Sequence, residues 1–284
     1  MASQAHQLGK VRMRRFFVFF LLLLALAAKA GNAQRKFVSL SPSITEIFFA
    51  IGAEDSLVGV VAPADYPPKA SEKEVVAGYD YVRYERMFAL GADECLTTEG
   101  MQDRETLKRI GELKIKVVEY RMGGLEDMFA SIIDIGARTG REEAAERLVA
   151  RLRSELDTTI RGNPQEKRRA VFVAGVDPLI VAGKGTFLND VLDKAGLVNA
   201  FKERSPSYFA ASPELIVEAK PEFLVLPGGE ISAEDRESLL SRLKPFIGGV
   251  RVLEVDADLI ARPSPRVVEG VKELAREVKK GGSG

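Results

Sequence analysis

The chain has 284 residues, of which 46% are hydrophobic and 29% charged, and its 41 basic and 41 acidic side chains cancel. This length and composition suit a folded protein of about two domains and exclude a disordered chain. Residues 1–30 hold five of the basic residues and no acid, so the remainder carries 36 basic and 41 acidic residues. A net charge of −5 on that remainder argues against a nucleic-acid partner, which needs a basic surface.

Residues 1–30 are predicted to be a secretory signal peptide. The basic stretch Lys10–Arg15 precedes 13 apolar residues, Phe16–Ala28. Ala28-Lys29-Ala30 has the small-x-small form of a cleavage site, and Gly31-Asn32-Ala33 is an alternative. Thirteen helical residues span about 20 Å, less than the roughly 30 Å hydrocarbon core of a bilayer. We therefore expect an exported protein, with an uncleaved membrane anchor as the alternative.

Cysteine usage bears on the compartment. Cys95 is the only cysteine of the chain, so an internal disulfide is not expected, and no cysteine lies at the predicted cleavage point to carry a lipid anchor. The surrounding residues read as a strand, in which a small buried residue is the expected role of Cys95. The sequence therefore predicts a soluble protein of a Gram-negative periplasm.

The first lobe is expected over residues 34–124, where strands alternate with helices. The predicted strands are Arg35–Leu40, Leu57–Val61, Glu94–Thr98 and Lys116–Tyr120. The first helix starts at the turn Ser41-Pro42-Ser43, because serine caps helices and proline suits an early helical position. Two more helices follow, one from Glu85 and one over Arg104–Leu113. Residues 62–84 read as an irregular segment.

A helical connection is predicted over residues 125–162, and a second lobe over 168–280. Glu126–Arg138 and Arg141–Ile160 read as helices, and the second spans about 30 Å. The strands and helices predicted for the second lobe are Ala170–Gly175, Phe187–Ala195, Pro213–Ala219, Phe223–Leu226, Glu237–Leu243, Val250–Val255 and Arg266–Lys280. Alternating strands and helices predict an α/β fold of parallel sheets covered on both faces.

Two stretches 129 residues apart repeat one pattern. Glu85 opens ERMFALGADECLTTEG and Glu214 opens ELIVEAKPEFLVLPGG; each runs through a helical turn and an acid (Asp93, Glu222) into a strand. TEIFFAIGA and NDVLDKAGL form a second such pair. We interpret the repeats as two lobes of similar build, each with one glutamate at the start of an equivalent helix, suited to docking. The alternative is that strand–helix units simply resemble one another.

The sequence lacks the residues that several kinds of catalytic and metal site require. His6 is the only histidine and lies within the predicted signal, so an exported body has no Ser-His-Asp or Cys-His site and no histidine-based zinc site. Gly183-Lys184-Gly185-Thr186 lacks the spacing of a phosphate-binding loop. We therefore expect no catalytic residues, no metal site and no cofactor. Hydrolysis by a carboxylate pair remains chemically open.

The aromatic side chains concentrate in two loop-like stretches. Four of the six tyrosines lie within 19 residues: Tyr66, Tyr79, Tyr81 and Tyr84. Tyr208-Phe209 precedes the helix of Glu214. Tyrosine offers a flat apolar face with a polar tip, which suits a large and partly polar ligand. The cluster favours a binding surface; the alternative is that these rings pin the long loop onto its own lobe.

An ordered set of motifs resembles a known family. These motifs are FVSLSPSITEIFFAIGAEDSLVGV, DYPP, YERMFALGADECL, VAGKGTFLNDVLDKAGLVNAF, SPELIVEAKPEFLVLPGG and RPSPRVVEGVKELA. Together they resemble the periplasmic binding proteins of ABC importers for cobalamin and iron complexes, and most closely the cobalamin-binding members. The resemblance covers nearly all of residues 35–278.

The resemblance implies two Rossmann-like lobes joined by one rigid helix, Arg141–Arg161, with a ligand in the cleft between them and little lobe closure. It implies that Glu85 and Glu214 meet arginines of an inner-membrane permease. Aromatic cleft positions fall on Tyr79 and Tyr208, where the cobalamin-binding members carry tryptophan. Pro63 falls on another such aromatic position, and Asp258 and Arg262 match cleft positions.

The expected function is therefore a monomeric periplasmic receptor, not an enzyme, that delivers cobalamin or a related corrinoid to its permease. Its expected ligand-binding residues are Tyr66, Tyr79, Tyr81, Tyr84, Tyr208, Phe209, Asp258 and Arg262. A haem or ferric-siderophore receptor on the same scaffold is the first alternative. An exported chelatase-like enzyme or carboxylate-based hydrolase, and a scaffold without a ligand, are the others.

Overall fold

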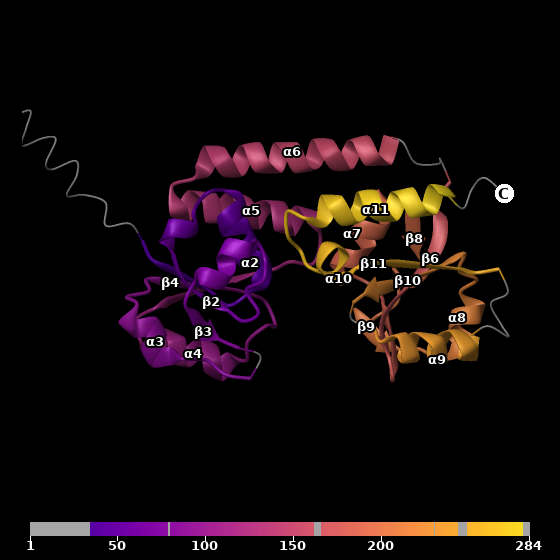
Figure 1. Ribbon diagram of the computed structural model, residues 1–284, viewed down its shortest axis with the longest axis horizontal. Helices are drawn as coiled ribbons and strands as arrows, with labels where there is room; N and C mark the ends of the chain where they lie inside the picture. Colours follow the sequence, from indigo (N-terminus) through magenta and orange to yellow (C-terminus); the bar gives the residue numbers. More distant parts are fainter. Residues whose placement is uncertain (1–34, 79, 162–165, 230, 244–248, 281–284) are drawn as a thin grey trace, which may run out of the picture. The chain divides into compact units, whose positions relative to one another are not determined.

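The structure is a computed structural model that describes residues 35–78, 80–161, 166–229, 231–243 and 249–280 (Figure 1). By its contacts the chain divides into two units, residues 1–35 and 36–284. The predicted signal peptide lies outside the described residues, and the account below concerns the second unit. No helix in the described part of the chain is both long and apolar enough to cross a membrane.

The first lobe is built on a five-stranded parallel sheet of order β3-β2-β1-β4-β5. Its strands are β1 (Phe37–Ser39), β2 (Leu57–Val61), β3 (Val75–Ala77), β4 (Glu94–Thr98) and β5 (Lys116–Tyr120). The helices α2 (Pro42–Ala50), α3 (Tyr84–Ala89) and α4 (Arg104–Glu112) connect them, with short 3₁₀ turns at Glu54–Ser56 and Pro68–Glu72. Its central strands β1 and β4 are almost wholly buried, as a sheet covered on both faces requires.

The second lobe contains a six-stranded sheet of order β11-β10-β6-β7-β9, with β8 beside β6. The strands are β6 (Arg168–Val176), β7 (Leu179–Ala182), β8 (Leu197–Asn199), β9 (Tyr208–Ala210), β10 (Phe223–Gly228) and β11 (Arg251–Asp256). Strands β8, β6, β10 and β11 run parallel. The sequence did not predict the antiparallel edge formed by β7 and β9. It arises because a two-residue turn at Asp177-Pro178 reverses the chain directly after β6.

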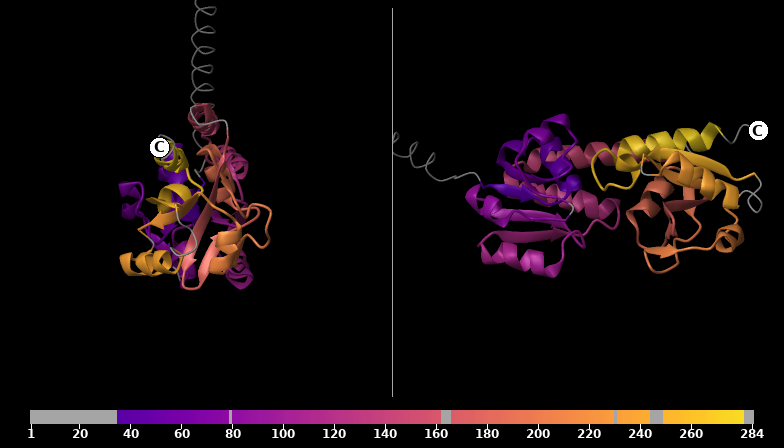
Figure 2. Two further views of the ribbon diagram at one scale, coloured as in Figure 1. Left: turned by 90° about the vertical axis from the view of Figure 1, so that its right-hand side faces the viewer. Right: turned by 60° about the horizontal axis from the view of Figure 1, so that its bottom comes forward.

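Seven helices complete the described part of the second unit. They are α5 (Leu125–Thr139), α6 (Glu142–Arg161), α7 (Phe187–Lys194), α8 (Pro213–Glu218), α9 (Ala233–Leu243), α10 (Ala257–Ile260) and α11 (Val267–Lys280). The turn from α5 to α6 uses Gly140 at φ +68°, a left-handed conformation that glycine adopts without strain. Helix α6 packs on α5 of the first lobe and on α7 and α11 of the second (Figures 1 and 2).

One apolar core runs beneath α6 from lobe to lobe. Leu148, Leu152 and Leu156 form the buried stripe of α6, at the spacing of one helical face. They belong to a single cluster that also holds Phe37 and Ile44 of the first lobe together with buried residues of α7 and α11. The fold is therefore two Rossmann-like lobes joined by one long helix, and that helix is part of a shared core.

The segments that lead from α3 into β4 and from α8 into β10 are held by the same contacts in the two lobes. Asp93 accepts a hydrogen bond from the Lys36 N–H at 2.8 Å, and its own N–H donates to the Lys36 carbonyl at 2.8 Å. Glu222 repeats both contacts with Arg169, at 3.1 and 2.8 Å. Thus the acids that the sequence repeat singled out have equivalent positions in the two lobes.

Candidate functional site

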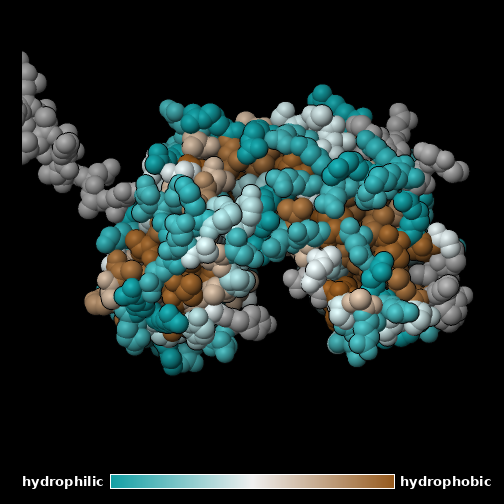
Figure 3. Space-filling view, in the orientation of Figure 1, coloured by the Kyte–Doolittle hydropathy of each residue, from teal (hydrophilic) through white to brown (hydrophobic). Residues whose placement is uncertain are grey.

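A cavity of about 900 Å³ lies between the two sheets. Residues that directly follow β1, β4 and β5 line it from the first lobe, and residues at the ends of β10 and β11 line it from the second. The carboxyl ends of parallel strands are the usual ligand site of open α/β sheets, because helix N-termini and loops gather there. The space-filling view shows the hollow between the lobes (Figure 3).

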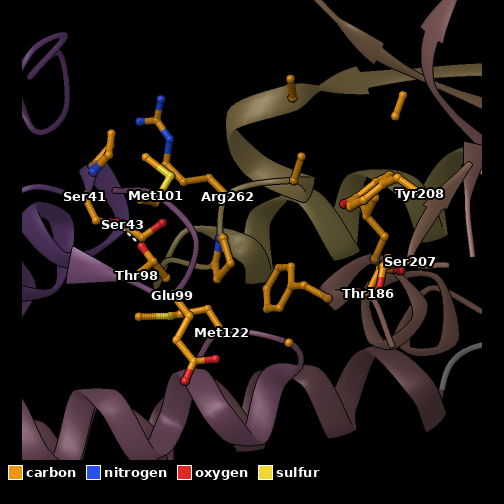
Figure 4. Close-up of a pocket in the computed structure, with 18 of the residues that line it drawn as sticks. Ser41, Ser43, Thr98, Glu99, Met101, Met122, Thr186, Ser207, Tyr208 and Arg262 are labelled. Atoms are coloured by element: carbon orange, nitrogen blue, oxygen red, sulfur yellow. Dashed lines mark hydrogen bonds between the residues drawn. The ribbon is translucent and has the colours of Figure 1, made fainter. Parts of the chain in front are cut away.

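The cavity has polar and apolar walls. Its first-lobe side carries Ser41, Ser43, Thr98, Glu99, Met101, Arg121 and Met122. Its second-lobe side carries Phe172, Thr186, Phe187, Ser207, Tyr208, Asp258 and Arg262. Figure 4 shows Ser41, Ser43 and Thr98 together on one side, with Thr186, Ser207 and Tyr208 opposite. Apolar surface with a few placed polar groups is typical of small-molecule sites.

Three residues predicted to bind ligand line the cavity: Tyr208, Asp258 and Arg262. The Tyr208 side chain is 49% exposed, and partial burial raises the pKa of its phenol. The phenol is therefore neutral at neutral pH. Burial also raises the pKa of Asp258, although the Arg262 guanidinium acts in the opposite direction.

Four other predicted aromatic residues, Tyr66, Tyr81, Tyr84 and Phe209, do not line the cavity. The Arg266 guanidinium lies over the Tyr66 ring, with its central carbon 3.8 Å from the ring centroid. Tyr81 is 42% exposed and its ring approaches Gly78. Tyr84 packs on the apolar core beside β3. Phe209 meets Phe201 edge to face inside its own lobe. Tyr79 lies outside the described residues.

Arg262 belongs to a cluster of charged groups that joins the lobes, and we call this the interlobe cluster: Glu46, Asp65, Tyr66, Asp258, Arg262 and Arg266. The Arg262 guanidinium lies 3.1 Å from the Glu46 carboxylate, 2.6 Å from Asp258 and 3.5 Å from Asp65. Arg266 bonds both oxygens of Glu46, at 2.7 and 2.9 Å. Glu46 is on α2 of the first lobe, whereas both arginines lie in the connection between α10 and α11 of the second.

Glu85 and Glu214 lie on the first turns of α3 and α8. Both side chains are exposed, and neither forms an ion pair with another described residue. A hydrogen bond from Ser212 lowers the pKa of Glu214, so this carboxylate is charged at neutral pH. The two glutamates therefore offer one free negative charge on each lobe.

The described residues contain no group of three or more histidine, cysteine, aspartate or glutamate side chains arranged to hold a metal ion.

Comparison with known proteins identifies the family. The model of the family described as "Periplasmic binding protein" matches residues 37–242. The chain belongs to this family. Proteins that it resembles are solute-binding components of ABC importers rather than enzymes. This periplasmic binding protein is thus a receptor of the importer type.

Two relatives illustrate the range. An uncharacterized ABC transporter substrate-binding lipoprotein, YvrC of Bacillus subtilis, is 29% identical over 86% of this chain and 80% of its own. A vitamin B12-binding protein of Pectobacterium carotovorum is 24% identical over 92% and 95%.

Solved structures share the fold. A possible iron-binding protein of Staphylococcus epidermidis has a TM-score of 0.74 at 26% identity, over 86% of this chain and 98% of that one. The haem-binding protein BhuT, in complex with two haems, has a TM-score of 0.76 at 19% identity over 87% and 98%. At 19% identity, the similarity to BhuT is evidence for a shared fold alone.

Several cavity residues of this periplasmic binding protein were not predicted from the sequence, among them Ser43, Met101 and Met122. They lie within four residues of the carboxyl ends of strands β1, β4 and β5, respectively. Their position in a parallel sheet was the available signal, since such strand ends open on the ligand site. Residue type alone, which favoured the tyrosines, does not indicate them.

Proposed function

We propose that this periplasmic binding protein carries cobalamin or a related corrinoid to its ABC importer. One observation supports this above the others: a cavity of about 900 Å³ opens at the strand ends of both lobes. That volume is near the upper end of small-molecule sites, roughly 300–1,000 Å³. Vitamin B12-binding proteins among the relatives support the same choice. The signal predicted at residues 1–30 would export the protein to the periplasm.

Binding would neither form nor break a covalent bond. Flat faces of the macrocycle would contact Tyr208, Met101 and Met122, which line opposite sides of the cavity. Burial of apolar surface stabilises a complex by roughly 25 cal/mol per Å², less the cost of association. Methionine adapts its shape to an irregular partner and makes favourable contacts with conjugated rings.

Haem is the second candidate, because the Tyr208 phenol reaches the cavity and no histidine is present after His6. Tyrosine is a known axial ligand of haem iron. Iron binding would have to displace the phenolic proton, which burial now retains.

Absorbance titrations with cyanocobalamin, haemin and a ferric siderophore test the ligand. We expect cyanocobalamin to bind with micromolar or lower Kd, and Tyr208→Phe to change that affinity little because the ring remains. Binding of haemin alone, with its spectrum altered by Tyr208→Phe, would establish the second candidate instead. Failure of all three ligands would overturn the proposed ligand class.

The proposed partner is an inner-membrane permease that receives the monomeric receptor through Glu85 and Glu214. Exposed ion pairs contribute only about 0–1 kcal/mol each, but they set orientation and raise the association rate. We expect Glu85→Ala plus Glu214→Ala to leave ligand affinity intact and to impair uptake in cells. Glu112→Ala plus Glu237→Ala, exposed carboxylates on α4 and α9, is the matched control. Normal uptake by the first double variant would exclude this docking mode.

A further inference from the structure

The first turn of α2 opens on the cavity with unused hydrogen-bond donors. Ser41 is its N-cap residue, and its side chain makes no capping bond to the helix. Instead, the Ser41 hydroxyl accepts a hydrogen bond from the Thr98 hydroxyl at 2.8 Å. Pro42 has no N–H group, and no described residue accepts a hydrogen bond from the N–H groups of Ser43 and Ile44. Ile44 is fully buried and does not line the cavity, so the Ser43 N–H is the free donor of this turn at the cavity wall.

The Ser43 hydroxyl is the second and independent observation. Ser43 is only 5% exposed, yet it lines the cavity, and no described residue forms a hydrogen bond with its hydroxyl. Polar side chains buried to this degree almost always have a partner. The hydroxyl oxygen itself is accessible from the cavity, so its open hydrogen-bonding position is directed at whatever occupies that cavity.

The turn is held rigidly, so its donors are already in position. The Ser39 hydroxyl donates to the Ser41 carbonyl at 2.8 Å, and the Thr45 hydroxyl donates to the Ser39 oxygen at 3.0 Å. Ser39 and Thr45 are fully or almost fully buried. A site whose donors need no rearrangement loses little free energy on binding.

The charges around the turn are compatible with an anion. Glu46, one helical turn further on, is neutralised by Arg262 and Arg266. The Glu99 carboxylate is directed away from Ser43 (Figure 4). Free N–H groups and the helix dipole together favour negative charge at a helix N-terminus.

We propose that the first turn of α2 binds an anionic substituent of the transported ligand, a carboxylate or a phosphate. The contacts are the hydroxyl and the N–H group of Ser43. This proposal rests on the proposed function only in taking the cavity as the ligand site. It adds the chemical class that the cavity selects: ligands with an acidic side group over their neutral derivatives.

The first test uses no macrocycle. Inorganic phosphate is titrated into the ligand-free protein while the amide resonances of the chain are followed by NMR. The Ser43 and Ile44 amides are expected to shift together and to saturate, and the shift is expected to weaken in Ser43→Ala. Ser154→Ala, an exposed serine on α6, is the matched control and keeps the shift. Unmoved Ser43 and Ile44 amides overturn the proposal.

The second test separates the two sources of negative charge. Haemin is compared with its dimethyl ester, which lacks the free carboxylates, and cyanocobalamin with cobinamide, which lacks the phosphate together with its ribose and benzimidazole. In the pair that the protein transports, the acidic member is expected to bind about tenfold more tightly, as a charge-assisted hydrogen bond predicts. Ser43→Ala is expected to reduce that ratio severalfold, whereas Ser154→Ala preserves it.

Equal affinities within both pairs would mean that the turn binds adventitious anions only, and would overturn the subsite. If none of the four macrocycles binds while phosphate still shifts the two amides, the ligand class under the proposed function fails and the subsite stands.

Discussion

The contact between the two lobes depends on one buried charge, the carboxylate of Glu46. Its side chain is 2% exposed, and the side chains of its partners Arg262 and Arg266 are 16% and 13% exposed. The hydrogen bond to Glu46 raises the pKa of Arg266, so this guanidinium stays charged over the whole physiological range. Arg262 already contacts three carboxylates. We therefore assign it primarily to the interlobe cluster and only secondarily to ligand binding.

Glu46→Gln should destabilise the protein because it leaves two partly buried guanidinium groups without their counter-charge. Loss of one partner of a buried ion pair costs about 3 kcal/mol in the free energy of unfolding. Glu143→Gln is the control, since Glu143 is 87% exposed and pairs only with Arg147, and it should cost less than about 0.5 kcal/mol. Urea unfolding measures both. Equal losses would show that the interlobe cluster does not stabilise the fold.

Helices α3 and α8 show what could be predicted at the scale of an element. The repeat around Glu85 and Glu214 was visible in the sequence because the helical turn, the acid and the strand are all local patterns. The structure adds that the second residue after each helix is left-handed: Gly91 at φ +68° and Lys220 at φ +46°. One backbone geometry is therefore met by glycine in one lobe and by lysine in the other.

This equivalence predicts opposite effects of two substitutions. Gly91→Ala should lower the free energy of unfolding by about 1 kcal/mol, since a left-handed conformation strains any residue with a Cβ atom. No clash adds to this cost, because the nearest atom to an added Cβ is 3.6 Å away. Lys220→Gly should be neutral or slightly stabilising, since relief of strain offsets the entropy gained by the unfolded chain. Thermal unfolding compares them, and a neutral Gly91→Ala would contradict the strain argument.

Other features could not be predicted because they depend on contacts distant in sequence. The antiparallel edge places β9 beside β7, some 25 residues earlier, and no local pattern encodes that pairing. Tyr84 and Phe209 are of residue types common in ligand sites. In the structure, however, Tyr84 forms a hydrogen bond with Thr106 and Phe209 packs on Phe201, each within its own lobe. Tyr208, Asp258 and Arg262 reach the cavity because they lie near strand ends or just after them.

At the scale of the whole second unit, two independent structures hold the lobes together. The first is the apolar core beneath α6, which is continuous from α2 to α11. The second is the interlobe cluster, on the first turns of α2 and beside α11. A hinge requires a segment with few buried contacts, and neither connection offers one. We therefore expect the separation of the lobes to change little when ligand binds.

Spin labels on Lys108→Cys of α4 and Glu237→Cys of α9 measure that separation, since these exposed sites lie on different lobes (Figure 1). Cys95 should stay unlabelled, because burial raises the pKa of its thiol to about 12. We expect one narrow distance distribution that cyanocobalamin leaves in place. Adding Glu46→Gln should broaden it, because one of the two connections is then lost. If cyanocobalamin instead shifted the distance between the labels while Glu46 was intact, the receptor would close on its ligand. The interlobe cluster would then not determine the width of the cavity.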